Sequence, residues 1–338
     1  MEFGDDYISY DEYLTSCKET KEALKLPKKE FCDFEFSPYK NNFLQIFTFY
    51  EEALQSLVEF GISPAYLYLS PYFSINARAR IHENKYIVNV NIGILKWIVE
   101  EFYLNEKLKN NSQFVKLKSL SINRLFGSAA AMFTIYHEIG HLVQNSKFLE
   151  SNLEEIPKKV KQFAIERHIL EIDADLFSSL CISEHLLYYA HTIYGKEVST
   201  KKLELMIVLF TIPFIIYLLS FEGNKQDIYF EEKTHPHPAI RLLAMITSIV
   251  TQCNLFLISH NRTPLNQKGC FVQSVLEAEK LQDVFFEDNR VTWFKLRTNF
   301  YQTKIQQYLV KILELKIGNA SMAVPKWHTM HNSINNKK

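Results

Sequence analysis

The sequence predicts a mostly helical α+β protein, for three reasons. The chain has 338 residues, of which 47% are hydrophobic and only nine are glycine, so it can bury a large core. Apolar residues recur at helical spacing over long stretches. The strand signal is confined to residues 65–92, where apolar and polar residues alternate. We therefore expect a small sheet surrounded by helices.

The N-terminal region is expected to be helical. Helical periodicity covers residues 7–26 and 43–60, and Pro27 and Pro38 interrupt the segment between them. The opening residues are acidic and lack an apolar stretch, which predicts no secretory signal. We expect one compact unit with three regions: a helical region over 1–60, a core over 61–255 and a helical region over 256–338.

The strand signal resolves into a short strand and a hairpin. Residues 65–69 form the first strand, and residues 78–92 form a hairpin that turns at residues 83–85. A helix is expected over residues 94–104. The second half of the hairpin, residues 86–92, could offer a sheet edge on which an extended substrate pairs.

The strongest chemical signal is the motif H-E-I-G-H, from His137 to His141, within a predicted helix over residues 128–143. Two histidines four residues apart lie on one helix face, which suits two ligands of one tetrahedral metal ion. The intervening Glu138 can reach a metal-bound water as general base. Gly140 costs the helix about 1 kcal/mol, which makes sense if another element packs closely there.

A catalytic zinc site needs a third protein ligand, and the best candidate lies on the next predicted helix, residues 163–187. The closely spaced pattern with a third histidine fails, because Gln144 and Lys147 occupy its glycine and histidine positions. Glu171 and Asp175 share one helix face. Glu171 would ligate the metal, and Asp175 would accept the outward N–H of a ligand histidine.

These residues also have plainer interpretations. Glu171 and Asp175 could form a solvated acidic face. His168 could be a rival ligand, or a supporting or surface histidine. Asp173 points to another side of the helix, so we expect it to be exposed.

A third cluster spans residues 234–238, Thr-His-Pro-His-Pro. Its two X-Pro steps predict extended backbone, with a helix starting at Pro238. His235 or His237 could place an imidazole over the site to stabilise an oxyanion, and Arg241 could pair with an acid nearby. The cluster could equally be a capped helix start with an incidental histidine.

Residues 205–221 are almost entirely apolar, and their length of 17 residues is the lower limit for crossing a bilayer. Pro213 lies in the middle, so we expect a buried core helix kinked there, with a membrane span as the alternative.

The other expected elements are a polar loop over 146–161 with solvated lysines, a polar break over 223–233, helices over 238–253 and 298–317, a cap at Gly318 and Asn319, and a frayed end over 320–338.

Charge and cysteine content exclude several classes of protein. The chain has 38 basic and 38 acidic residues, so nothing global favours binding to nucleic acid or to an anionic membrane. The five cysteines are scattered at long spacings without a C-x-x-C motif. This pattern predicts no disulfide framework and suits the reducing cytoplasm.

The H-E-I-G-H motif, the E-x-x-A-D run from Glu171 to Asp175 and the H-P-x-x-x-x-R run from His235 to Arg241 together resemble the glutamate-type zinc peptidases, or gluzincins. The pattern looks like the HtpX/Ste24-like peptidases. It is also similar to the ImmA/IrrE-type peptidases and to the Lit-type phage-exclusion peptidases. The resemblance covers residues 129–241, one third of the chain.

The resemblance implies a zincin-like core in which His137, His141 and Glu171 hold Zn²⁺, Glu138 is the general base and Asp175 orients a ligand. It further implies a metalloendopeptidase that hydrolyses a protein or peptide, is cytoplasmic and serves in phage defence. HtpX-like families have several membrane helices, whereas this chain has one candidate, so a membrane role is not expected.

Two other functions stay open. The protein could be a non-catalytic helical binding or regulatory module whose metal is structural or lost, with His168 or His235 as a fourth ligand. It could also be a membrane-associated peptidase.

Overall fold

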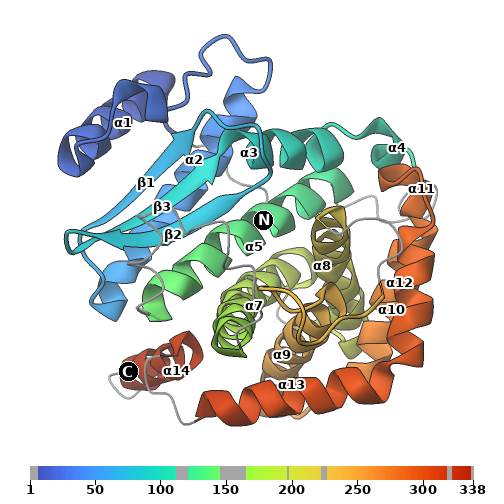
Figure 1. Ribbon diagram of the computed structural model, residues 1–338. Helices are drawn as coiled ribbons and strands as arrows, with labels where there is room; N and C mark the ends of the chain where they lie inside the picture. The colour runs from blue at the N-terminus through green and yellow to red at the C-terminus, as the bar shows by residue number, and fades with distance from the viewer. Residues whose placement is uncertain are drawn as a thin grey trace.

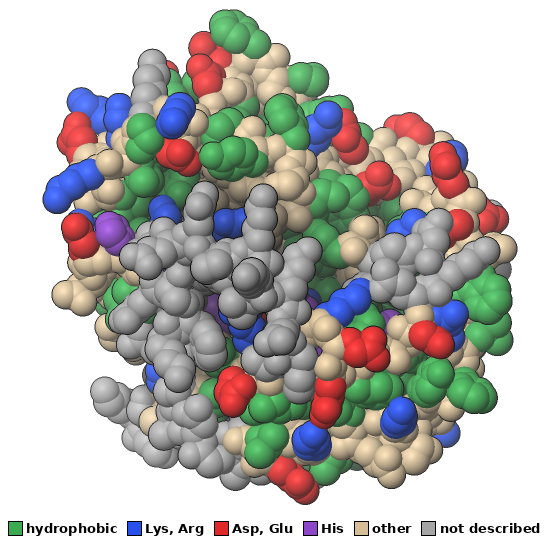
Figure 2. Space-filling view, viewed as in Figure 1, with side chains coloured by type: hydrophobic (Ala, Val, Ile, Leu, Met, Phe, Trp, Pro, Cys, Tyr) green, Lys and Arg blue, Asp and Glu red, His purple; other side chains and the backbone are tan. Residues whose placement is uncertain are grey.

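Most of the chain in the computed structural model is helical, with one three-stranded sheet near the N-terminus (Figure 1). The structure describes residues 7–111, 121–144, 165–195, 198–221, 227–317 and 322–335. The predicted α+β class is confirmed. On the face drawn in Figure 2, the coloured acidic and basic side chains are interspersed.

The two predicted N-terminal helices are present, as α1 (Tyr10–Leu24) and α2 (Lys40–Gln55). Helix α1 starts with a capping box, in which the Ser9 hydroxyl accepts from the Glu12 amide and the Glu12 carboxylate accepts from the Ser9 amide. Short 3₁₀ turns follow the helices, η1 (Lys28–Glu30) and η2 (Ser56–Phe60).

The sheet consists of β1 (Ala65–Ser70), β2 (Ala77–His82) and β3 (Lys85–Asn91), in the order β1-β3-β2. The hairpin β2–β3 is antiparallel, and its two turn residues, Glu83 and Asn84, have φ angles of 47° and 59°. β1 pairs with β3 in parallel. The prediction that β3 offers a sheet edge is therefore wrong, because β3 is the central strand.

The chain passes from β3 into α3 (Ile92–Ile98), a π-helical turn η3 (Val99–Tyr103) and α4 (Glu106–Lys109). Helix α5 (Ile122–Gln144) then runs beside the sheet, packing against β2, α7 and α8. Because it is covered on several sides, nearly all of its residues are buried. It begins six residues before the predicted start at residue 128.

Helix α7 (Ile165–Tyr194) is the closest neighbour of α5 and continues beyond the predicted end at residue 187. The remaining helices form the other half of the molecule (Figure 1). They are α8 (Thr200–Ser220), α9 (Pro238–Ser259), α10 (Gln267–Lys280), α11 (Gln282–Phe285), α12 (Arg290–Phe300), α13 (Gln302–Ile317) and α14 (Ala323–Asn335).

Two expectations for the C-terminal region are wrong. The single helix predicted over 298–317 is divided at Tyr301 between α12 and α13. The end predicted to fray over 320–338 contains helix α14, which packs against α7 and α5. The predicted loop over 146–161, residues 223–226 of the polar break, and the cap at Gly318 and Asn319 lie outside the described residues.

Within the described residues, two helices are long and apolar enough to cross a membrane, α8 and α9. The sequence indicated only the first. In α8, 78% of the apolar window is buried inside the protein, against 44% in α9. Helix α8 packs against α5, α7, α9 and α10, with Pro213 inside it. Its apolar residues are therefore core residues of this fold.

Candidate metal centre

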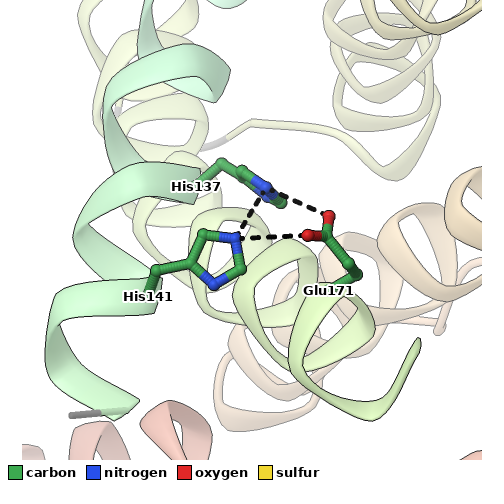
Figure 3. A group of neighbouring side chains, drawn as sticks. All are labelled: His137, His141 and Glu171. Carbon is green, nitrogen blue, oxygen red and sulfur yellow. Dashed lines mark hydrogen bonds and ion pairs between the residues drawn. The ribbon is translucent and has the colours of Figure 1, made fainter. Parts of the chain in front are cut away.

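Helix α5 brings its two histidines together at one end of the helix. His137 and His141 are one turn apart, and their Nε2 atoms lie 3.1 Å from each other (Figure 3). Their side chains are only 11% and 16% exposed. Helical spacing therefore places the two imidazoles around one point, as the motif predicts.

Glu171 reaches the same point from α7 (Figure 3). Its carboxylate oxygens lie 3.4 Å from Nε2 of His137 and 3.6 Å from Nε2 of His141. The approach depends on Gly140, since a Cβ atom there would lie 2.9 Å from the backbone Cα of Ala174. Sequence reasoning expected a closely packed element at Gly140, and α7 is that element.

The donor set fits a tetrahedral divalent metal. Zinc bound at about 2.0–2.1 Å by nitrogen or oxygen gives donor–donor edges of about 3.3 Å. The two Nε2 atoms lie 3.1 Å apart, and they lie 3.4 and 3.6 Å from different oxygens of the Glu171 carboxylate, so the separations are of that order. His137, His141 and Glu171 are the group in the described part of the chain that could hold a metal ion. Two imidazole nitrogens and a carboxylate are ligands that Zn²⁺ accepts.

Asp175 lies one turn after Glu171, where it approaches the other side of His137. Its Oδ1 lies 2.9 Å from His137 Nδ1. Arg241, from α9, donates hydrogen bonds to both oxygens of the same carboxylate through Nε and Nη2, each at 2.7 Å. The Asp175 side chain is fully buried and that of Arg241 is 12% exposed, so the ion pair is screened little by solvent.

The pKa shifts follow from this arrangement. Burial would lower the pKa of His137, but the carboxylates of Asp175 and Glu171 outweigh burial and raise it to about 10. Burial opposes ionisation of Glu171, but the surrounding histidines hold its pKa well below the ordinary value. Burial likewise opposes ionisation of Asp175, and Arg241 keeps its pKa low. The ionised carboxylates of Glu171 and Asp175 thus favour a positive charge at the point where the donor atoms meet.

Glu138 points into the protein from the same helix as the histidines and is 8% exposed. Burial raises the pKa of Tyr217, and the negative charge of Glu138 nearby adds to that shift. The carboxylate therefore lies in an enclosed region beside His137.

His235 lies at the exposed side of the centre. Its side chain is 61% exposed, and its Nε2 is 3.5 Å from a carboxylate oxygen of Glu171. Its other ring nitrogen is 3.0 Å from the Thr234 hydroxyl. His237 instead caps α9, accepting the Ala239 amide at Nδ1. The structure therefore brings His235, and not His237, to the centre.

His168 is kept away from the centre by its own partners. Its Nε2 is 2.8 Å from the Lys233 carbonyl, and its Nδ1 is 2.9 Å from the Tyr308 hydroxyl. A carbonyl only accepts, so Nε2 carries the proton and Nδ1 accepts from the tyrosine. Both ring nitrogens are engaged, and the imidazole is fully buried. His168 supports the packing of α7 and α13.

Sequence reasoning misjudged two residues behind His141. Asp173, expected to be exposed, is fully buried, because it accepts the backbone amides of Ala323 and Val324 at the start of α14. Gln144 had figured only as a mismatch to the third-histidine pattern, yet its Oε1 lies 3.1 Å from His141 Nδ1. The burial of Asp173 could not be recognised, because the backbone amides that bind it lie 150 residues further along the chain.

The candidate centre lies between the two buried helices α5 and α7. Residues 79–257 match the model of the family peptidase U49, and the chain belongs to that family. The matched segment, more than half of the chain, contains every residue of the centre described above. It ends before α10 to α14. No curated protein and no solved structure matches the chain.

Membership in a peptidase family makes the protein a hydrolase that acts on proteins or peptides. The predictions of an enzyme and of a protein or peptide substrate are thereby confirmed.

Proposed function

We propose that the protein is a zinc-dependent endopeptidase whose ligands are His137, His141 and Glu171. The observation that carries the proposal is the convergence of three donor side chains whose nearest atoms lie 3.1, 3.4 and 3.6 Å apart and which are only 11%, 16% and 14% exposed. Bringing two imidazole nitrogens and a carboxylate this close is favourable when a cation lies between them.

A bound zinc ion would supply a water with a pKa near 7 and would polarise the scissile carbonyl. Glu138 takes the proton from the attacking water and passes it to the leaving amine. Asp175 and Arg241 hold His137 in place. His235, at the exposed side, donates to the oxygen of the scissile carbonyl as negative charge develops on it.

The sheet gives the substrate a second place to bind. β2 packs against α5 and pairs with β3 on one side, while its outer edge pairs with no other strand among those the structure describes. An extended peptide would pair with that edge through backbone hydrogen bonds. The role predicted for β3 thus passes to β2.

The test is the Glu138→Gln variant, which keeps the shape of the side chain and removes the base. We expect cleavage to fall about 10²–10⁴-fold, while zinc content measured by atomic emission stays at one ion per chain. New protein termini in a bacterial lysate, compared between wild type and variant, report the cleavage. Full activity in the variant would refute the role of Glu138.

A matched control separates loss of the base from loss of the metal. Glu171→Ala removes a ligand, so we expect it to lose both zinc and cleavage, unlike Glu138→Gln. A wild-type protein that binds no zinc would overturn the proposed function.

The second candidate is a non-catalytic module with a structural metal, favoured only by the position of His235 beside Glu171. A closed site needs four protein ligands. In the enzyme, His235→Ala keeps zinc and lowers kcat. In a structural site, the same change releases zinc and lowers the melting temperature.

We further propose that the protein is soluble, cytoplasmic and active in phage defence. All five cysteines are free, as is typical of a reducing compartment, and α8 is covered by other helices. Fractionation without detergent tests the location. Plaque counts on cells carrying wild type or Glu138→Gln test the role, and equal counts would contradict it.

A further inference from the structure

Two polar side chains, Gln144 and Asp173, lie behind His141 and take no part in the proposed chemistry. Gln144 is the last residue of α5 and is 1% exposed, and Asp173 on α7 is fully buried. His141 Nδ1 lies 3.1 Å from Gln144 Oε1. The Gln144 Nε2 group donates to the Leu170 carbonyl at 2.7 Å and to an Asp173 oxygen at 3.0 Å.

These contacts fix the orientation of the Gln144 amide. The Leu170 carbonyl and the Asp173 carboxylate only accept hydrogen bonds, so both must face the NH₂ group of Gln144. The amide oxygen is then left to face His141. Because that oxygen can only accept, Nδ1 of His141 must carry a proton, and in the neutral imidazole Nε2 then presents a lone pair to His137 and Glu171.

The carboxylate that orients the amide is itself held by the C-terminal helix. The Ala323 amide donates to Asp173 Oδ2 at 2.6 Å, and the Val324 amide lies 3.4 Å from Oδ1. These are the first residues of α14, whose N-terminus favours a negative charge. Helix α14 lies outside the segment that matches the family model.

We propose that Gln144, oriented by Asp173 and α14, is a positioning residue that holds His141 in the tautomer with Nε2 free for the metal. The inference deepens the proposed function and rests on it for the identity of the metal. It makes α14 part of the support of the centre. His137 is held by a carboxylate, whereas His141 is held by an amide, so the two ligands are positioned by different means.

Gln144→Met tests the proposal, because methionine has a similar length and neither accepts strongly nor donates. We expect zinc affinity, measured by competition with a chelator, to fall about 10–100-fold. In metal-free protein at pH 8, ¹⁵N-histidine NMR should show one tautomer of His141 in the wild type and a mixture in the variant. Asp173→Asn should shift both readouts in the same direction by less.

Lys326→Met is the matched control. Lys326 reaches from α14 to the Val143 carbonyl at 2.5 Å, and its charge also acts on Asp173. This variant therefore removes a contact between α14 and α5 and a nearby charge, but it keeps the hydrogen bonds of Asp173 and Gln144. We expect zinc affinity and the His141 tautomer to stay at wild-type values.

Wild-type zinc affinity together with a single tautomer in Gln144→Met would overturn the proposal. An equal loss of affinity in Lys326→Met would also overturn it, since loss of helix docking would then explain the effect. A wild type that binds no zinc would refute the proposed function instead, while the tautomer in the metal-free protein would still decide whether Gln144 positions His141.

Discussion

Gly140 determines how closely the two ligand helices approach each other. A Cβ atom at this position would lie 2.9 Å from the Cα and 3.3 Å from the carbonyl oxygen of Ala174. Backbone atoms cannot move aside as the end of a side chain can. The separation between His141 and Glu171 therefore depends on the absence of one methyl group.

We predict that Gly140→Ala lowers both the free energy of unfolding and the zinc affinity. The gain in helix propensity is about 1 kcal/mol, and overpacking against backbone costs typically 1–3 kcal/mol, so the net effect is destabilising. Urea unfolding and chelator competition measure the two effects.

Gly269→Ala in α10 is the control for this substitution. The nearest atoms to a new Cβ there belong to the Asn266 side chain, at 3.4 Å and beyond, an ordinary contact. We expect this variant to be stabilised by up to about 1 kcal/mol with unchanged zinc affinity. If both variants were stabilised, close packing at Gly140 would not be the constraint.

At the scale of elements, the ion pair between Asp175 on α7 and Arg241 on α9 stabilises the packing of the two helices. We predict that Asp175→Asn costs about 3 kcal/mol or more in zinc-free protein, because it leaves a buried guanidinium without its bidentate partner. The double variant Asp175→Asn with Arg241→Met should be more stable than the single variant, since it removes a buried guanidinium that retains only Glu171, 3.8 Å away, as a charged partner.

The measurement is a double-mutant cycle in urea, with Arg241→Met as the second single variant. Additive losses, with the double variant the least stable of the four proteins, would show that the two residues do not act as a pair.

The elements that the sequence predicted are those whose signals are local. Helices α5 and α7 follow from apolar periodicity, and the β2–β3 hairpin follows from alternation around Glu83 and Asn84. The convergence of His137, His141 and Glu171 follows from helix geometry once α7 is placed against Gly140. Their roles in metal binding and catalysis stay predictions.

The errors arise where pairing is non-local. The parallel pairing of β1 with β3 joins segments about 20 residues apart, and alternation alone cannot show which strand is central. Burial of Asp173 depends on amides that belong to α14, a helix without a strong apolar pattern at the end of the chain. A carboxylate on a helix has no local sign of such a partner.

At the scale of the whole molecule, burial of His185 makes stability depend on pH. Burial lowers its pKa to about 4, and its Nε2 lies 2.6 Å from the Tyr136 hydroxyl. The unfolded chain binds this proton with a pKa near 6.5. The folded state binds it more weakly, so its contribution to stability is complete above about pH 6.5 and is lost as the pH falls towards 4.

We therefore predict that His185→Gln, which keeps an acceptor for Tyr136, loses less stability than the wild type between pH 7 and pH 5. The difference is about 2 kcal/mol at most. Urea unfolding at the two pH values measures it. Parallel losses in both proteins would place the pH dependence elsewhere in the chain.

The burial of α8 has a consequence for how the protein is made. Thr200–Ser220 leaves the ribosome before α9 and α10, two of the helices that cover it. During that interval the nascent chain carries an apolar helix, long enough to cross a bilayer, that has α5 and α7 but not yet α9 and α10 to pack against. The apolar surface of α8 is therefore buried to its final extent only after the C-terminal helices have been made, and the order of synthesis exposes part of it first.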